Sequence, residues 1–237
     1  HLIDDGSLSA ERIAVIRHLF PEGRVRLAQE SLDLLEQELP ARRYGAIHRR
    51  WRSLMVFRKL TDVHLGSSAP RVFLDSDMLF WRRPDIFLDW YDRWIDCPTA
   101  PGFTSCFMTD CTESYGYPVD RMSSLAGHPV PRMLNTGVNA LHSSLIDWDE
   151  LEHWIHCLEA EHGTSYFLEQ ALFAMASSRA QVLRLPIESY VVSPEATSAA
   201  VVNCALQHYV YDSKPHYFGR AWRQWLNSVN IAASTHV

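Results

Sequence analysis

The chain has 237 residues, of which 47% are hydrophobic and 21% are charged, which predicts a single domain with one sizeable core. Its net charge of −6 argues against nucleic-acid-binding proteins, which are usually strongly basic. No apolar run approaches the ~18 residues of a membrane-spanning helix and no signal-peptide pattern is present, so we expect a soluble protein without a transmembrane segment.

The first part of the chain predicts one strand and two helices. Leu2-Ile3, followed by a polar turn, is typical of a strand end, and residues 9–20 have helical spacing with Ser9 as the N-cap. A second helix is predicted over residues 29–39, because its leucines fall on one face and Pro40 closes it. The chain therefore opens inside a βα unit.

A basic stretch then precedes an acidic turn. Residues 41–61 contain six arginines and Lys59 but no acidic residue, and we expect most of these side chains to be solvated, with one or two directed at phosphate. The apolar strand 72–74 leads directly to Asp75 and Asp77. Because residues i and i+2 of an extended chain share a face, the two carboxylates point at one spot. Such a pair suits Mg²⁺ or Mn²⁺, which can bridge the oxygens of a departing diphosphate.

The middle of the chain predicts a helix, an irregular insertion and a strand. The segment after Pro84 repeats apolar residues with helical spacing up to Ile95. Prolines and polar residues break the pattern over about 97–132, so we expect a long loop there that carries the acceptor side of a binding site. Residues 134–141 predict a strand that is interrupted by Asn135-Thr136-Gly137.

Two helices follow this strand. The first is an amphipathic helix over residues 151–158. The second, capped near Thr164 or Ser165, carries Glu169 and Gln170 close to its start. The second helix therefore presents a polar pair at one end.

The last part of the chain returns to short strands. They are predicted near 181–185 and 205–210, before Lys214-Pro215 and a C-terminal helix whose Trp222 and Trp225 we expect in the core. Strands thus alternate with helices throughout, which predicts an α/β fold with a mostly parallel or mixed sheet covered by helices. Such sheets bind ligands at the carboxyl ends of their strands.

The use of lysine points to the same regions. Of 22 basic side chains only two are lysines, Lys59 and Lys214, and both lie close to motifs named here. In a chain that otherwise uses arginine, a retained lysine suggests that a compact ammonium group is wanted at that position.

The five cysteines indicate a cellular compartment. They form no C-x-x-C pair and their number is odd, which favours a reducing, cytoplasmic location over a disulfide framework. We expect each to be a small buried hydrophobic residue. They are Cys97, Cys106, Cys111, Cys157 and Cys204.

Several motifs occur in a characteristic order along most of the chain. They are Leu2–Ser7, Arg58-Lys59-Leu60, Val72–Asp77, Leu134–Val138, Glu169-Gln170, and His208-Tyr209 followed by Lys214-Pro215. This arrangement resembles the retaining GT-A glycosyltransferases of the glycogenin and lipopolysaccharide galactosyltransferase family, known as glycosyltransferase family 8. The resemblance implies a Rossmann-like mixed sheet flanked by helices and the transfer of a sugar from a nucleotide-sugar donor, expected to be a UDP-sugar.

The resemblance also implies a metal site and a diphosphate site. In that family the residues that match Asp75, Asp77 and His208 hold a Mn²⁺ or Mg²⁺ ion, for which carboxylate and imidazole ligands are chemically suitable. The matches to Lys59 and Lys214 bind the donor diphosphate as point charges.

The reacting sugar would lie beside a second group of residues. By the same resemblance, Asn135, Thr136 and Gly137 contact the donor, and Gln170 lies against the anomeric carbon. Gln170 and Glu169 would stabilise the oxocarbenium-like centre or provide the nucleophile of a retaining reaction. The acceptor, whether carbohydrate, lipid-linked or protein, is not specified by any motif.

The sequence departs from the family pattern in three places. The strand that would precede Leu2 is absent, so we expect an N-terminally truncated domain. Glu169 stands where aspartate is usual, and Lys59 stands where arginine is usual.

Two other functions remain as alternatives to glycosyl transfer. A haloacid-dehalogenase-type phosphatase would employ Asp75 and Asp77 after a hydrophobic strand, and a catalytically silent module would bind sugar or protein without turnover.

Overall fold

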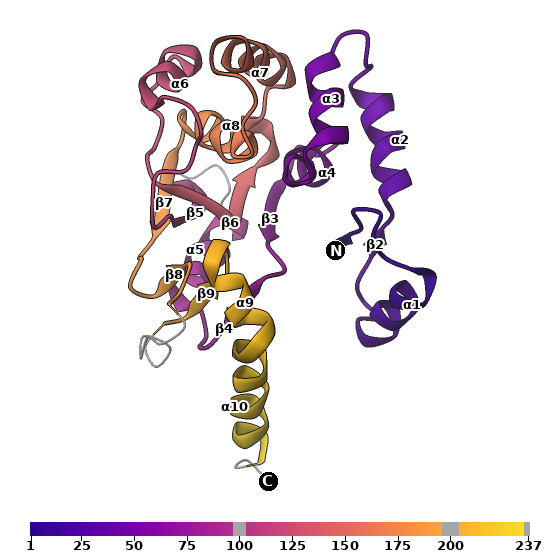
Figure 1. Cartoon of the computed structure of the whole chain (residues 1–237), viewed down its shortest axis with the longest axis vertical. Coiled ribbons are helices and arrows are strands. Elements are labelled where there is room, and N and C mark those ends of the chain that lie inside the picture. The colour runs from indigo at the N-terminus through magenta and orange to yellow at the C-terminus, as the bar shows by residue number, and fades with distance from the viewer. Residues whose placement is uncertain (97–102, 196–203, 235–237) are drawn as a thin grey trace.

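The computed structural model describes residues 1–96, 103–195 and 204–234 and has an α/β architecture (Figure 1). A parallel pair joins β1 (Leu2–Ile3) to β2 (Val25–Arg26). The largest sheet has the order β3 (Pro70–Leu74), β6 (Leu134–His142), β5 (Phe103–Thr109) and β7 (Gln181–Leu185). A third sheet has the order β4 (Met78–Phe80), β9 (Leu206–His208) and β8 (Tyr190–Val192). Parallel and antiparallel neighbours occur in both larger sheets, so the expected α/β fold with mixed sheet and flanking helices is confirmed.

Two N-terminal helices follow the sequence prediction closely, namely α1 (Ala10–Leu19) and α2 (Ala28–Glu38). The basic stretch, for which no helix was predicted, forms α3 (Gly45–Ser53) and α4 (Arg58–His64). Ser9 caps α1 as expected, since its Oγ accepts a hydrogen bond from the Arg12 amide at 3.3 Å. No residue of α1 is buried, whereas Leu35 of α2 is completely buried in the main core. Helix α2 is therefore anchored by burial and α1 chiefly by its local hydrogen bonds.

The main core lies between the large sheet and three further helices. These are α6 (Val119–Ala126), α7 (Trp148–His162) and α8 (Leu168–Ser177). All ten residues of α8 are buried, and this helix lies between the large sheet and the helices α6 and α7 (Figure 1). It begins later than expected, because Ser165 caps a turn by accepting from the Phe167 amide and helical structure starts at Leu168. Glu169 and Gln170 thus lie in a buried first turn.

The prediction of one irregular insertion over 97–132 was wrong for the described residues of that segment, 103–132. They contain β5, a central strand paired antiparallel to β6 and parallel to β7, followed by α6. Ser105 to Met108 are all buried, so the strand shows no alternation of polar and apolar residues that would reveal it in the sequence. Residues 97–102 lie outside the described part.

A second cluster covers the other face of the sheets. Helix α5 (Asp85–Asp96) contributes Phe87, Trp90 and Trp94, which pack against residues of β4, β5, β6 and β8. The expected helix after Pro84 is confirmed, although Ile95 is exposed.

The C-terminal helices are α9 (Lys214–His216) and α10 (Trp222–Ser234). Helix α10 extends away from the three-stranded sheet (Figure 1). Trp225 donates from Nε1 to the Phe80 carbonyl at 2.6 Å and packs against a small core cluster, as predicted. Trp222 is 37% exposed, so its predicted place in the core was wrong, because α10 is in contact along one side only. Among the described residues no helix is long and apolar enough to cross a membrane.

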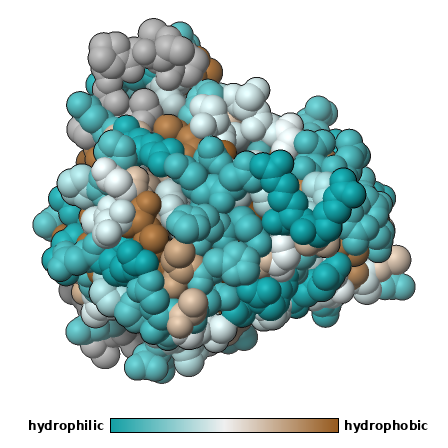
Figure 2. Space-filling view, turned by 90° about the horizontal axis from the view of Figure 1, so that it is seen from above, coloured by the Kyte–Doolittle hydropathy of each residue, from teal (hydrophilic) through white to brown (hydrophobic). Residues whose placement is uncertain are grey.

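The surface seen from above is mostly hydrophilic, with small separate apolar areas (Figure 2). Arginines of the basic stretch form ion pairs with acidic residues of α7, including Arg43 with Asp149 and Arg50 with Glu159. The expectation that few of these side chains serve an anion site is therefore consistent with the structure. The four cysteines of the described residues are free, with Cys106 and Cys204 buried as expected. The prediction of burial was wrong for Cys111, which is exposed, and for Cys157, which is only half-buried.

Candidate metal centre and adjoining cavity

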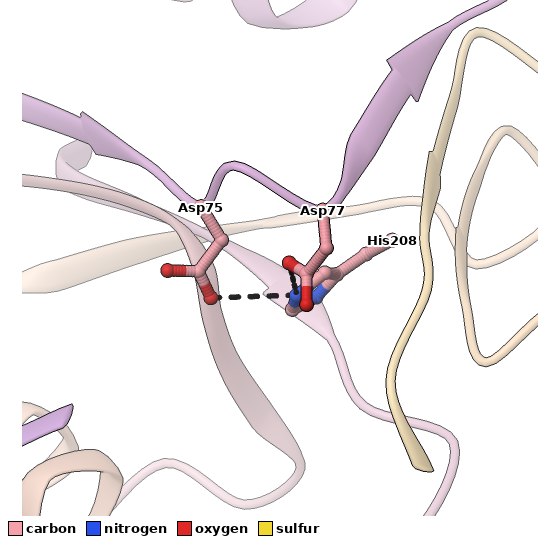
Figure 3. A group of neighbouring side chains, drawn as sticks. All are labelled: Asp75, Asp77 and His208. Atoms are coloured by element: carbon pink, nitrogen blue, oxygen red, sulfur yellow. Dashed lines mark ion pairs between the residues drawn. The ribbon is translucent and has the colours of Figure 1, made fainter. Parts of the chain in front are cut away.

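Three potential metal ligands converge between β3, β4 and β9. Asp75 and Asp77 stand at the two ends of the short turn that joins β3 to β4, and both carboxylates face the ring of His208 on β9 (Figure 3). His208 Nε2 lies 3.3 Å from Asp75 Oδ2 and 3.2 Å from Asp77 Oδ1. One ligand atom from each residue lies within 4.8 Å of the others. Two carboxylate oxygens and one imidazole nitrogen form a donor set that fits Mn²⁺ or Mg²⁺.

Backbone pairing explains this convergence. The Asp75 amide donates to the Gly137 carbonyl of β6 at 2.9 Å, which extends the β3–β6 ladder by one residue. The Tyr209 amide donates to the Asp77 carbonyl at 2.9 Å, beside the Met78–His208 pair of β4 and β9. The three side chains are therefore fixed by strand register, not by a flexible loop.

The ring of His208 is held from behind. Its Nδ1 lies 2.9 Å from Asn135 Oδ1, and its face covers Gly137 so closely that a Cβ there would lie 2.3 Å from Nδ1. Nε2 is buried and has no hydrogen bond of ordinary geometry, although two carboxylates lie near it. A divalent cation bound between the two carboxylates would give this buried nitrogen the partner that it lacks.

The charges at this site perturb one another. Burial lowers the pKa of His208, but the nearby carboxylates of Asp75 and Asp77 outweigh it and raise that pKa overall. Burial raises the pKa of Asp77, while His208 and Lys214 lower it, and the net result is a lowered pKa. Asp77 thus remains an ionised acceptor for a cation.

Each aspartate forms an ion pair with a different lysine. Lys59 Nζ lies 2.7 Å from Asp75 Oδ2, and Lys214 Nζ lies 3.2 Å from Asp77 Oδ2. Burial lowers the pKa of Lys59, but the charges of Glu169 and Asp75 raise it more, so Lys59 stays protonated. Lys59 is nearly buried, whereas the side chain of Lys214 is 51% exposed. Of these two lysines, Lys214 is therefore the one whose exposed side chain can reach an incoming anion.

Glu169 and Gln170 approach the same place from α8. Thr136 Oγ1 donates to Glu169 Oε2 at 3.2 Å, and the Thr136 amide donates to Gln170 Oε1 at 3.4 Å. Burial raises the pKa of Glu169 to about 7, against the lowering effect of Lys59.

The predicted interruption of β6 is a β-bulge. Asn139 pairs with Phe107 of β5, whereas the next residue of β5 pairs with Asn135. Strand β6 is continuous, so the predicted motif marks a bulge that brings Thr136 to α8.

The predicted residues meet at one cavity of about 550 Å³. Nine of the ten predicted site residues line it: Lys59, Asp75, Asp77, Asn135, Thr136, Glu169, Gln170, His208 and Lys214. Gly137 does not, because it lies behind the His208 ring. Three aromatic residues that sequence reasoning missed also line the cavity: Tyr166, Phe167 and Tyr211. Their positions next to Glu169 and His208 in the sequence were the available signal.

Comparisons with known proteins leave the family open. No protein-family model matches the chain, and no curated protein matches it. Among solved structures, the apo form of mouse xyloside xylosyltransferase 1 is similar, with a TM-score of 0.49 and 13% identity over 84% of this chain and 81% of that chain. At this level of likeness, any assignment of function depends on the residues of the site itself.

Proposed function

We propose that the chain is a divalent-metal-dependent glycosyltransferase of the GT-A type that takes a sugar from a nucleotide-diphosphate donor, with a UDP-sugar as the expected donor. The observation that carries this proposal is the convergence of residues from six elements on one cavity. Asp75 and Asp77 follow β3, and β6, α8 and β9 supply the donor-facing polar groups, while α4 and α9 supply one lysine each. Unrelated motif matches have no physical reason to meet in this way.

The metal-binding end of the cavity suits a diphosphate. A Mn²⁺ or Mg²⁺ ion held by Asp75, Asp77 and His208 would supply Lewis-acid stabilisation of the departing nucleotide. Lys214, half exposed at 3.2 Å from Asp77, binds diphosphate oxygens as a point charge. Lys59 neutralises Asp75 and Glu169 from the buried side. With the divalent ion bound, the positive charges of the ion and the two lysines would exceed the negative charges of Asp75, Asp77 and Glu169, so an anion would be attracted locally although the whole chain carries −6.

The buried end of the cavity suits the reacting sugar. Glu169 is 3% exposed and Gln170 6%, so water is largely excluded from around them. Gln170 turns its amide oxygen toward Thr136, which places a partial negative charge at the cavity wall. A carboxylate or carbonyl oxygen in a dry site stabilises positive charge at an anomeric carbon, because the local dielectric constant is low. Retention of configuration remains part of the proposal, with Gln170 and Glu169 as the groups nearest that carbon.

The first experiment measures UDP binding by calorimetry with and without Mn²⁺. We expect binding that depends on Mn²⁺ and is lost in Asp77→Ala, whereas the exposed, non-lining Asp212→Ala keeps it. Slow hydrolysis of a UDP-sugar by the wild-type chain would then establish turnover. Metal-independent UDP binding, or its persistence in Asp77→Ala, would contradict the proposal.

The same material tests the two alternatives. A phosphatase that uses Asp75 as nucleophile would hydrolyse simple phosphate esters and be inhibited by a phosphate-mimicking fluoride complex. A silent module would bind UDP with Mn²⁺ and hydrolyse no donor. Either result would replace glycosyl transfer with the corresponding function.

A further inference from the structure

A carboxylate that no sequence motif marked lies directly behind the site. Asp110 follows β5 and is completely buried. It does not line the cavity, and within residues 1–96, 103–195 and 204–234 no ion pair involves it. Hydrogen bonds hold its side chain: Oδ1 accepts from the Cys111 amide at 2.8 Å, and Oδ2 accepts from two side-chain amides. A buried carboxylate with this arrangement fixes the direction of every group that donates to it.

The first side chain that Asp110 orients is Asn135. Asn135 Nδ2 donates to Asp110 Oδ2 at 3.3 Å, so its amide oxygen must point the opposite way. That oxygen accepts from the Gly137 amide at 3.0 Å and faces His208 Nδ1 at 2.9 Å. A rotated amide would set its oxygen against the carboxylate and its NH₂ group against the Gly137 amide, which is itself a donor. The orientation of Asn135 is therefore determined.

The consequence for His208 is a fixed tautomer. An amide oxygen can only accept, so His208 Nδ1 must carry the proton that it shares with Asn135. In the neutral imidazole the lone pair then resides on Nε2, the atom that faces Asp75 and Asp77. A histidine that binds metal commonly has its other ring nitrogen fixed in this way.

The second side chain is Gln170. Its Nε2 donates to Asp110 Oδ2 at 3.2 Å and to the Ser114 carbonyl at 2.8 Å, so its oxygen is turned toward the Thr136 amide and the cavity. One buried carboxylate oxygen thus receives both amide groups. It orients the residue behind the metal ligand and the residue nearest the reacting centre.

We propose that Asp110 is a positioning residue that sets the tautomer of His208 through Asn135, and with it the direction of the metal-binding lone pair, while also orienting Gln170. The metal part of this proposal rests on the proposed function. The tautomer part does not, because it concerns hydrogen bonds within the metal-free chain.

Asp110→Asn tests the proposal with nearly unchanged shape. An asparagine carries an NH₂ group where one carboxylate oxygen stood, so at least one of the three donors around it meets another donor. We expect Mn²⁺, titrated alone, to bind about 10- to 100-fold more weakly, the usual effect of changing a partner behind a ligand. Asp62→Asn is the matched control, since Asp62 is also buried and hydrogen-bonded, but its side-chain partners, Trp51 and Thr61, do not line the cavity. It should leave Mn²⁺ affinity unchanged.

Nitrogen NMR of the metal-free protein provides the second readout. His208 signals are assigned by their loss in His208→Gln and recorded at alkaline pH, where the ring is neutral. Wild type should show protonation at Nδ1 only, and Asp110→Asn a mixture of both tautomers. Gln170→Leu removes the hydrogen bond between Gln170 and Asp110 and should leave the His208 signals unchanged.

The outcomes separate this proposal from the proposed function. An Asp110→Asn protein with wild-type Mn²⁺ affinity and a single Nδ1-protonated tautomer overturns the positioning role. Wild type that binds no Mn²⁺ refutes the metal site, and the NMR result then decides the Asp110 role alone. If Asp110→Asn does not fold, Asn135→Ala removes the residue that links Asp110 to His208 by hydrogen bonds. An unchanged His208 tautomer in Asn135→Ala then overturns the proposal.

Discussion

Gly137→Ala places one methyl group against the back of the candidate metal ligand. The new Cβ would lie 2.3 Å from His208 Nδ1, 2.4 Å from His208 Cε1 and 2.6 Å from Met78 Cε. Ordinary contact begins at 3.4 Å, so the imidazole must move by about 1.1 Å, the difference between 3.4 and 2.3. Gly137 has no unusual φ, so alanine fits its backbone and only these contacts oppose the change.

The His208 imidazole cannot shift without losing other contacts. His208 lies on β9, which is paired with β4 on one side and β8 on the other. A ring shift of that size breaks the 2.9 Å contact with Asn135 and changes the distances to both aspartates. Overpacking of a buried site costs about 1–3 kcal/mol, and we expect Mn²⁺ affinity to fall at least tenfold.

Calorimetric Mn²⁺ titration and urea unfolding measure the two effects. Gly45→Ala is the matched control, because nothing lies within 4 Å of a Cβ built there. As Gly45 begins α3, alanine should leave Mn²⁺ affinity unchanged and leave stability equal or up to about 1 kcal/mol higher. A Gly137→Ala protein with wild-type Mn²⁺ affinity would refute the placement of His208 in a metal centre.

Three further outcomes follow from the structure. Since burial raises the pKa of Glu169 from 4.5 to about 7, its contribution to metal-free stability is fully present below pH 4.5 and is lost as pH rises through 7, by about 3 kcal/mol. Glu169→Gln should flatten that part of the stability profile in urea titrations, and an unchanged slope would contradict the burial argument. Lys214→Ala removes a half-exposed cation, so UDP should bind about fivefold more weakly, a loss of about 1 kcal/mol, and with less salt dependence in calorimetry; equal affinity at low salt would exclude its phosphate role. Trp154→Ala should reduce the unfolding free energy by about 3–5 kcal/mol while the folded protein keeps its Mn²⁺ affinity, because Trp154 is 2% exposed in α7 and does not line the cavity.

Elements with a one-sided pattern were predictable from the sequence. The helix over 151–158 lies inside α7 and buries Leu151, Trp154, Ile155 and Leu158, since one face of a helix recurs every three to four residues. The strand before Asp75 was equally visible, because an apolar run there ends in a polar turn. Local periodicity is sufficient to predict an element where a single face of it is buried.

Elements buried on every side were harder to identify. Residues Ser105 to Met108 of β5 are buried on both faces, and polar and apolar residues do not alternate between those faces, so the sequence pattern does not reveal the strand. Trp222 shows the opposite error, since an apolar helical spacing predicts a buried face only if another element covers it. Burial is a property of neighbours that the local pattern does not contain.

The sequence by itself determined which chemical groups are present and how they are spaced locally: two carboxylates on one side of a turn, a glycine in a polar break of a strand, an acidic-amide pair opening a helix, and two lysines. The tertiary structure alone decided that these groups meet, because strand register places His208 over Gly137 and between Asp75 and Asp77. It also decided the role of Asp110, whose hydrogen bonds to Asn135 and Gln170 join three distant segments. Such contacts depend on long-range packing, which local propensity does not specify.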